Sequence, residues 1–199
     1  MGGRVRLVSS MLLLLVAVSC GASGGAVSGG QLYTVTTMVM QKPGEAPHAC
    51  AAAPLPYPPI GCGGPDVRGL DLATLPGVVL YVNGVRVSRT LRLVGTWDAG
   101  TLVLTRRPTA VDPARSTQIH VCQQPNGFTA NGDTPPMMQR LMADTELLRS
   151  RGIMLLEFGP CDESTYFTVV PVADADTVQF LADRYGPTLR IYGWMEPVD

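Results

Sequence analysis

The chain has 199 residues, of which 46% are hydrophobic, and its 15 basic and 16 acidic side chains give a formal net charge of −1 at pH 7. This length suits one domain or two small ones with genuine cores. Proteins that bind nucleic-acid backbones usually carry a basic face. Because this composition offers none, we predict no nucleic-acid partner.

The first residues have the layout of an export signal. A basic start with Arg4 and Arg6 precedes an apolar run that ends at Val18, and Ser19 separates this run from Cys20. The run is shorter than the roughly 20 apolar residues that a transmembrane helix needs. We therefore predict that residues 1–19 are a signal peptide.

Cys20 is the predicted lipidation site. Ala17-Val18-Ser19-Cys20 resembles the lipobox of bacterial lipoproteins, with Ala17 where leucine is commonest. Residues 20–30 are rich in glycine and serine, which predicts a flexible tether. We expect a protein anchored through lipid on Cys20 to the outer face of the cell membrane. The alternative is a secreted protein cut near Ala22.

Four further cysteines predict disulfides, because they are even in number and the chain has an export signal. Three pairings are possible, and the elements expected below favour Cys50 with Cys62 and Cys122 with Cys161. The spacing lacks the close cysteine pairs of zinc sites. We predict no structural metal and no cofactor.

Residues 31–107 predict a small β domain. Short segments of β-forming residues are separated by strong turn sequences, with no helical pattern between them. A bridge from Cys50 to Cys62 would hold the loop at 42–65, which is rich in proline and glycine. We predict a small antiparallel β-barrel or sandwich. The expected strands are Gln31–Met40, Val78–Val82, Val85–Gly95 and Thr101–Thr105, with turns at Asn83-Gly84 and Asp98-Ala99-Gly100.

Residues 117–199 predict a second domain with the order βαββαβ, the ferredoxin-like arrangement, so the expected fold class is α+β. In such a sheet the first and third strands are antiparallel neighbours, which brings Cys122 close to Cys161. The expected strands are Thr117–Cys122, Ile153–Phe158, Tyr166–Val172 and Thr188–Trp194; one helix starts at Pro135-Pro136 and ends at Gly152, and another is capped by Asp174 or Asp176 and ends at Gly186.

Residues 50–105 resemble a family of uncharacterised actinobacterial exported proteins. The resemblance rests on Pro58-Pro-Ile-Gly-Cys-Gly-Gly-Pro65 and on the hairpin sequence Val94-Gly-Thr-Trp-Asp-Ala-Gly-Thr-Leu-Val-Leu-Thr105. Leu70-Asp71-Leu72 departs from the Trp-Asp-Trp that is common in that family. The resemblance implies export and paired cysteines, and it implies no activity.

The two histidines offer little catalytic chemistry. His48 lies in a proline-rich loop and is expected to be solvated, with a metal ligand or a base as the alternative. His120 precedes Cys122, whose expected disulfide removes the thiolate that a Cys–His pair needs. No GxSxG, P-loop, HExxH or GxGxxG motif occurs.

Acidic and sulfur-containing side chains supply the remaining candidates. Carboxylate groups at Glu157, Asp162 and Glu163, or at Asp174, Asp176 and Asp183, suit acid–base work or calcium, although a polar hairpin tip and helix capping explain them as well. The methionines at 38, 40, 137, 138 and 142 suit copper, but Met138 and Met142 are expected to pack on a helix's apolar face. Tyr57 is a candidate contact residue on the disulfide-closed loop.

The sequence therefore predicts a non-enzymatic, membrane-anchored lipoprotein that binds an envelope protein or a cell-wall partner. The first alternative is an enzyme or an envelope protein that binds a small ligand or a metal through acidic residues near Glu157 and Asp162. A further alternative is metal capture by His48 and the methionines.

Overall fold

A computed structural model describes residues 30–52, 54, 61–119, 121–122, 135–162 and 164–199. The predicted signal peptide, Cys20, most of the tether, Tyr57, His120 and Glu163 lie outside these residues. Among the residues that the structure describes, no helix is long and apolar enough to cross a membrane.

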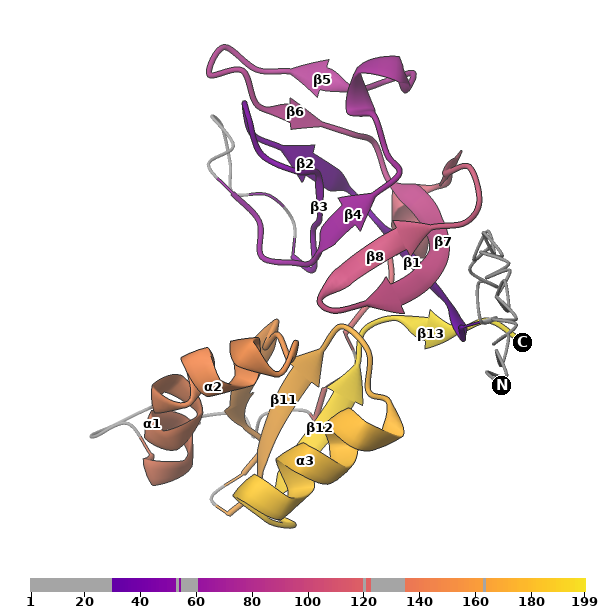
Figure 1. Cartoon of the computed structure of the whole chain (residues 1–199). Coiled ribbons are helices and arrows are strands. Elements are labelled where there is room, and N and C mark those ends of the chain that lie inside the picture. Colours follow the sequence, from indigo (N-terminus) through magenta and orange to yellow (C-terminus); the bar gives the residue numbers. More distant parts are fainter. Residues whose placement is uncertain (1–29, 53, 55–60, 120, 123–134, 163) are drawn as a thin grey trace, which may run out of the picture.

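The described residues form two lobes, each built on one sheet (Figure 1). We call them the β lobe and the α/β lobe. In the described chain the β lobe has a ten-stranded sheet with the order β13-β1-β7-β8-β4-β3-β2-β6-β5, and β9 pairs with β7. Its strands are β1 (Leu32–Thr37), β2 (Val39–Gln41), β3 (His48–Ala49), β4 (Asp66–Arg68), β5 (Val79–Leu80), β6 (Arg86–Val87), β7 (Leu91–Asp98), β8 (Thr101–Leu104), β9 (Thr109–Ala110) and β13 (Glu196–Pro197). Two short 3-10 helices, Leu72–Thr74 and Pro113–Arg115, connect them.

Both predicted hairpin turns of the β lobe are confirmed. Tyr81 and Val85 flank Asn83-Gly84, and the Tyr81 amide donates to the Val85 carbonyl at 2.9 Å. Gly84 adopts a φ of 78°, which glycine tolerates and most residues do not. The turn between β7 and β8 likewise places Gly100 at a φ of 90°. Local turn chemistry therefore fixes both hairpins.

The sheet is neither a closed barrel nor wholly antiparallel. Its order has free ends at β13 and β5, and β4 pairs with β8 in parallel. The chain bends at Met38, so that β1 pairs with β7 while its continuation β2 pairs with β3 and β6. The expected strand Val85–Gly95 is interrupted between β6 and β7, because Ser88 turns its backbone and hydroxyl toward Val39, at 2.9 Å each.

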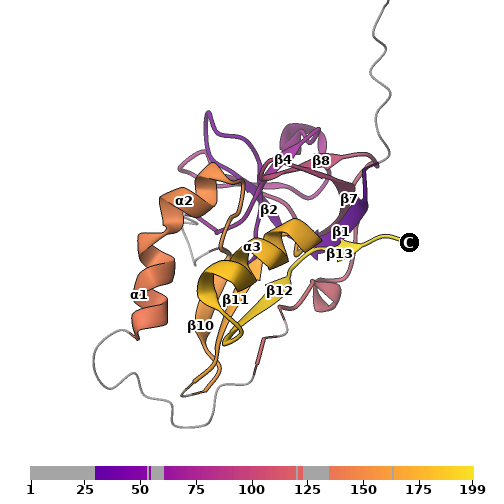
Figure 2. The same cartoon turned by 60° about the horizontal axis from the view of Figure 1, so that its bottom comes forward.

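The α/β lobe contains α1 (Pro136–Ala143), α2 (Thr145–Ser150), β10 (Glu157–Pro160), β11 (Tyr166–Val170), α3 (Ala175–Tyr185) and β12 (Leu189–Gly193). Strand β10 is antiparallel to β11, and β12 is parallel to β11 after the crossover through α3. The Asp174 carboxylate accepts from the Thr177 amide at 2.7 Å and so caps α3, which ends at Gly186 as predicted. Figure 2 shows α3 lying over the face of this small sheet.

The ferredoxin-like arrangement is not found in the described residues. That arrangement needs a strand between the third and fourth strands, but β11 and β12 pair directly from Tyr166↔Leu189 to Val170↔Gly193. The described residues of the segment 117–122, where the first strand was expected, do not form a strand. The helix expected from 135 to 152 is also divided into α1 and α2 at Asp144. The α/β lobe is a mixed sheet with one βαβ crossover.

The largest hydrophobic core joins the two lobes. It contains buried residues of the β lobe, among them Leu93 and Leu102. It also contains Phe167 and Val169 of β11 and Trp194, which follows β12. The C-terminal strand β13 also crosses back and pairs with β1. The predicted domain boundary after residue 107 thus separates two parts of the chain that share a core and a sheet.

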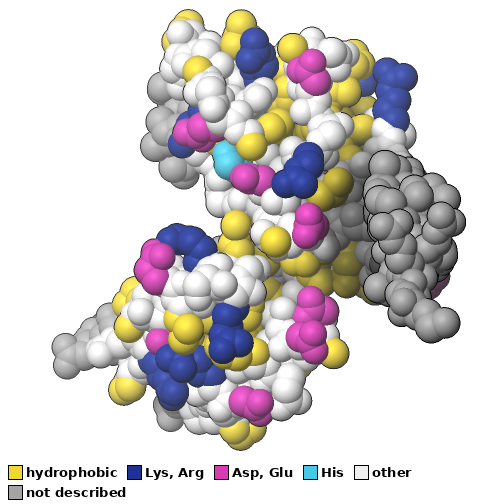
Figure 3. Space-filling view, viewed as in Figure 1, with side chains coloured by type: hydrophobic (Ala, Val, Ile, Leu, Met, Phe, Trp, Pro, Cys, Tyr) yellow, Lys and Arg dark blue, Asp and Glu magenta, His cyan; other side chains and the backbone are white. Residues whose placement is uncertain are grey.

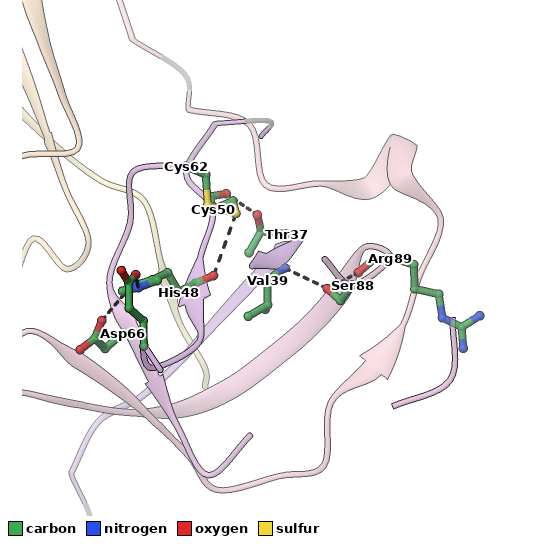
Figure 4. The surroundings of a disulfide bond; sticks show 9 residues. Thr37, Val39, His48, Cys50, Cys62, Asp66, Ser88 and Arg89 are labelled. Atoms are coloured by element: carbon green, nitrogen blue, oxygen red, sulfur yellow. Dashed lines mark hydrogen bonds and ion pairs between the residues drawn. A yellow bond between two sulfur atoms is a disulfide. The ribbon is translucent and has the colours of Figure 1, made fainter. Parts of the chain in front are cut away.

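Both predicted disulfides are confirmed. Cys50 and Cys62 are linked with their Cα atoms 5.2 Å apart, and Cys122 and Cys161 with theirs 5.4 Å apart. Around the Cys50–Cys62 bridge, the Cys50 carbonyl accepts from the Thr37 hydroxyl (Figure 4). The Cys50 amide donates to the Met38 carbonyl. The bridge therefore ties the disulfide loop to the bend between β1 and β2.

Candidate functional site

Two adjoining hollows lie between the lobes, and we call them together the interlobe cleft. The first has a volume of about 390 Å³ and the second about 380 Å³. Both are lined by Met154 and Leu155, so these residues form a shared floor. The space-filling view shows the gap between the upper and lower lobes, with the single described histidine on its upper side (Figure 3).

The upper wall carries a cluster of ionisable side chains around His48. His48 on β3 lies opposite Asp66 on β4, and its Nδ1 is 2.8 Å from the Asp66 Oδ1. Its Nε2 is 3.5 Å from the Glu45 Oε2, and the Lys42 ammonium is 3.9 Å from the same oxygen. Figure 4 shows the His48 ring directed at Asp66.

The prediction that His48 is a solvated loop side chain is wrong. The residue belongs to a strand, and its side chain is only 25% exposed. Its partner Asp66 is 18 positions away in the sequence and meets it through the antiparallel pairing of β3 and β4. The Asp66 carboxylate on Nδ1 fixes the ring orientation, and Nε2 lies toward the Glu45 carboxylate on the wall of the first hollow.

The disulfide loop completes the upper wall. Gly61, Cys62, Gly63 and Gly64 all line the first hollow, and the Gly63 carbonyl accepts from the Ala51 amide at 2.8 Å. At Gly64 a Cβ atom would lie 1.7 Å from the Ala49 carbonyl oxygen, so only glycine fits there. This wall is therefore backbone-rich and is fixed close to β3.

The lower wall of the cleft is the segment between α2 and β10, and it includes the floor residues Met154 and Leu155. Gly152, at a φ of 73°, ends α2, and the Ile153 amide donates to the Leu148 carbonyl at 2.9 Å. The Leu156 amide donates to the Val169 carbonyl at 2.8 Å and so begins the pairing with β11. Between these two anchors, Met154 and Leu155 make no backbone hydrogen bond within the described chain.

The structure does not bring Glu157 and Asp162 together. Glu157 is exposed at the first residue of β10, whereas Asp162 lies two residues beyond its last residue, so that about 16 Å of extended chain separates them. The Asp162 carboxylate accepts from the amides and hydroxyls of Ser164 and Thr165. These hydrogen bonds, led by that of the Thr165 hydroxyl, hold the Asp162 pKa far below its usual range. Asp162 thus stabilises a turn.

Two of the other acidic candidates, Asp174 and Asp183, also have local structural partners. Asp174 caps α3, and Asp183 accepts from the Gln179 amide group at 2.7 Å on the same helix. Among the described residues no group of three or more His, Cys, Asp or Glu side chains is placed to hold a metal ion.

The methionines divide between the core and the surface. Met40 is buried and lines the first hollow, and Met137 packs partly against the core of the α/β lobe. The prediction that Met142 packs on an apolar helix face is wrong, because it is 49% exposed. Met142 is the penultimate residue of α1.

A charged cluster that the sequence did not reveal joins the helices of the α/β lobe. Asp144, between α1 and α2, accepts two hydrogen bonds from Arg184 at 2.7 and 2.6 Å and one from the Tyr185 hydroxyl at 2.9 Å. The Arg184 hydrogen bond lowers the Asp144 pKa, whereas burial and the hydrogen bond to Asp144 raise the pKa of Tyr185 to about 12. This cluster lies outside the cleft and clamps the α1–α2 junction to α3.

The cleft therefore combines an apolar floor, a carboxylate-held histidine and a backbone-rich wall in one place. Comparison with models of protein families, with curated proteins and with solved structures finds no match for this chain.

Proposed function

We propose that the protein is an exported, lipid-anchored envelope protein that binds its partner or ligand in the interlobe cleft. The signal-like start, the lipobox-like sequence at Cys20 and two disulfides support export and anchoring. The resemblance of residues 50–105 to actinobacterial exported proteins agrees with this location. It contributes no activity.

The observation that carries the binding role is the pair of adjoining hollows. Ligand sites are typically concave and largely apolar, with a few polar groups that fix orientation. Here Leu155 and Phe158 supply apolar surface, while His48 and Asp66 supply the polar groups. Apolar and polar side chains thus face the same cleft between the lobes.

The anchor is tested by replacing Cys20 with alanine and expressing the protein in its native host. We expect the unaltered chain in the membrane fraction, with diacylglycerol on Cys20 detected by mass spectrometry. The Cys20→Ala protein is expected in the medium or retained uncut. Equal release of both proteins into the medium contradicts the anchor.

The binding role is tested by crosslinking on intact cells, followed by affinity capture and mass spectrometry. Met154→Asp places a charge on the cleft floor, and Met142→Asp places the same charge on an exposed helix outside it. We expect the partner captured by the unaltered chain to be lost with Met154→Asp and kept with Met142→Asp. Equal capture by both variants contradicts a cleft site.

A second candidate is acid–base catalysis by His48, favoured by its pairing with Asp66 through Nδ1. That arrangement orients an imidazole so that Nε2 can take a proton. Within the described residues the first hollow is lined by no hydroxyl and no free thiol, and this candidate takes water as the nucleophile. Turnover of a captured ligand that stops with His48→Gln while binding persists would establish this activity; persistence of turnover would exclude it.

A further inference from the structure

Both walls of the interlobe cleft present backbone groups that have no partner in the described chain. On the lower wall these are the N–H and C=O groups of Met154 and Leu155. On the upper wall, Gly61, Cys62 and Gly64 make no backbone hydrogen bond within the described residues, and Gly63 uses only its carbonyl. Since both segments line the first hollow, one occupant can reach both.

Backbone groups that have no partner within the described residues, on two sides of one hollow, favour a ligand that is itself backbone. An extended polypeptide carries donors and acceptors along both edges, so it can pair with a segment on either side. Three glycines on the upper wall have no side chain to keep another backbone away. A compact small molecule would satisfy few of these groups and would leave the rest buried and unpaired.

The charges of the cleft indicate which side chain such a ligand carries. Lys42 is paired with Glu45, and Arg149 is paired with Glu146. Among the described residues Asp66 is paired with His48 and with no lysine or arginine, so it is the carboxylate of the cleft that lacks such a partner. A lysine or arginine beside Asp66 would neutralise that charge.

Resting on the cleft-binding function above, we propose that the ligand is an extended polypeptide segment that lies between Gly61–Gly64 and Met154–Leu156, with a basic side chain beside Asp66. The apolar side chains of the segment then enter the second hollow, against Ile153, Leu155 and Phe158. The anchored protein would recognise a stretch of a neighbouring envelope protein in its extended form.

The test uses the exported chain with both disulfides formed and a probe peptide of seven residues that alternate valine and lysine, acetylated and amidated. Amide hydrogen exchange is measured residue by residue with and without the peptide. We expect the amides of Met154 and Leu155 to exchange fast in the free protein and at least tenfold more slowly with peptide. The Leu156 amide, already paired with Val169, is the internal control.

Two matched changes separate backbone pairing from simple hydrophobic adhesion. Methylation of alternate peptide nitrogens removes donors from the ligand and leaves the protein intact, so we expect at least tenfold weaker binding. Replacement of the peptide's lysines with glutamates should weaken binding similarly, and Asp66→Asn should abolish that preference. Undiminished binding of the methylated peptide, or an unchanged lysine preference in Asp66→Asn, overturns the inference.

The outcomes distinguish this inference from the proposed function. Loss of the native partner with Met154→Asp, combined with unprotected wall amides at saturating peptide, refutes the polypeptide ligand and leaves the cleft function standing. Protection by peptide, combined with undiminished capture of the native partner by Met154→Asp, supports peptide binding and refutes the cleft as the partner's site. Protection that rises with protein concentration alone identifies a second copy as the occupant and overturns the inference.

Discussion

The β lobe and the α/β lobe are stabilised by different kinds of interaction. In the β lobe β3, β5, β6 and β9 are two residues long each. Strand β5 pairs with β6 across a local turn, whereas β3, β6 and β9 pair with β4, β2 and β7, which lie 17 or more positions away. In the α/β lobe the five-residue strands β11 and β12 are joined by the eleven-residue helix α3, which has its own caps. One lobe is held by distant backbone pairing, the other by local helix signals and side-chain contacts.

The difference determines what each lobe contributes to the cleft. The upper wall, in the β lobe, consists of short strands and a loop, which need the Cys50–Cys62 bridge to hold their positions. The lower wall needs no bridge of its own, because Gly152 and the pairing of Leu156 fix both of its ends. The β lobe thus supplies the charged groups of the cleft, and the α/β lobe supplies an apolar floor that is fixed at both ends.

The largest expected effect comes from the longer disulfide loop. Cys122 and Cys161 are 39 positions apart, and Cys50 and Cys62 are 12 apart. In the chain-entropy account, replacing both cysteines of the Cys122–Cys161 bridge with serine should cost about 4 kcal/mol. The same change at the Cys50–Cys62 bridge should cost about 3 kcal/mol. Urea unfolding of the two double variants measures both values.

The effects of the same two variants on ligand binding should have the opposite order to their effects on stability. Loss of the Cys50–Cys62 bridge frees the upper wall, so it should weaken capture of the partner more than loss of the Cys122–Cys161 bridge does. If both variants capture the partner equally weakly at the same folded fraction, the Cys50–Cys62 bridge does not hold the upper wall in its binding position.

Core truncation in each lobe tests whether the lobes unfold together. Leu102 lies in the shared core and Leu181 in the core of the α/β lobe, and both are fully buried. Leu102→Ala and Leu181→Ala should each destabilise the chain by about 3 kcal/mol. Because β13 and the shared core join the two lobes, we expect each substitution to shift one cooperative transition in calorimetry. A second transition in Leu181→Ala alone would show that the lobes are independent.

Asp144 should have a smaller effect that is confined to the α/β lobe. Asp144→Asn weakens the hydrogen bonds with Arg184 and Tyr185 and should cost about 2 kcal/mol. A double-mutant cycle with Tyr185→Phe measures the coupling in urea unfolding. The matched control is Asp183→Asn on the exposed face of α3. Equal costs for both asparagine variants would contradict the clamp.

The sequence predicted the features that depend on neighbouring residues. The Asn83-Gly84 turn, the Asp174 cap and the end of α3 at Gly186 all follow from local conformational preferences. The cysteine pairs were also predicted, although the strand used to argue for Cys122 is not found in the described residues.

Pairing between distant segments could not be predicted. A two-residue strand such as β3 has no periodicity, so nothing in the sequence indicated that His48 would meet Asp66. The same holds for the pairing of β13 with β1 and for the direct pairing of β11 with β12. The hydrophobic patterns of these strands do not indicate which other strand each one pairs with. The candidate site was missed for this reason: its walls come from segments more than 80 residues apart.

The smallest expected effect is an acid-dependent one at Asp162. Because its folded pKa is far below the usual value, Asp162 contributes stability that is fully present above an unfolded pKa of about 3.9. That contribution is lost as the pH falls toward the folded pKa. We therefore expect Asp162→Asn to flatten the acid side of the stability profile in urea unfolding between about pH 5 and 2. Thr165→Val should flatten it too, because the Thr165 hydroxyl is the largest cause of the shift. Thr165→Ser keeps the hydroxyl and should preserve the slope; if it flattens the profile as much as Thr165→Val does, the hydroxyl is not the cause.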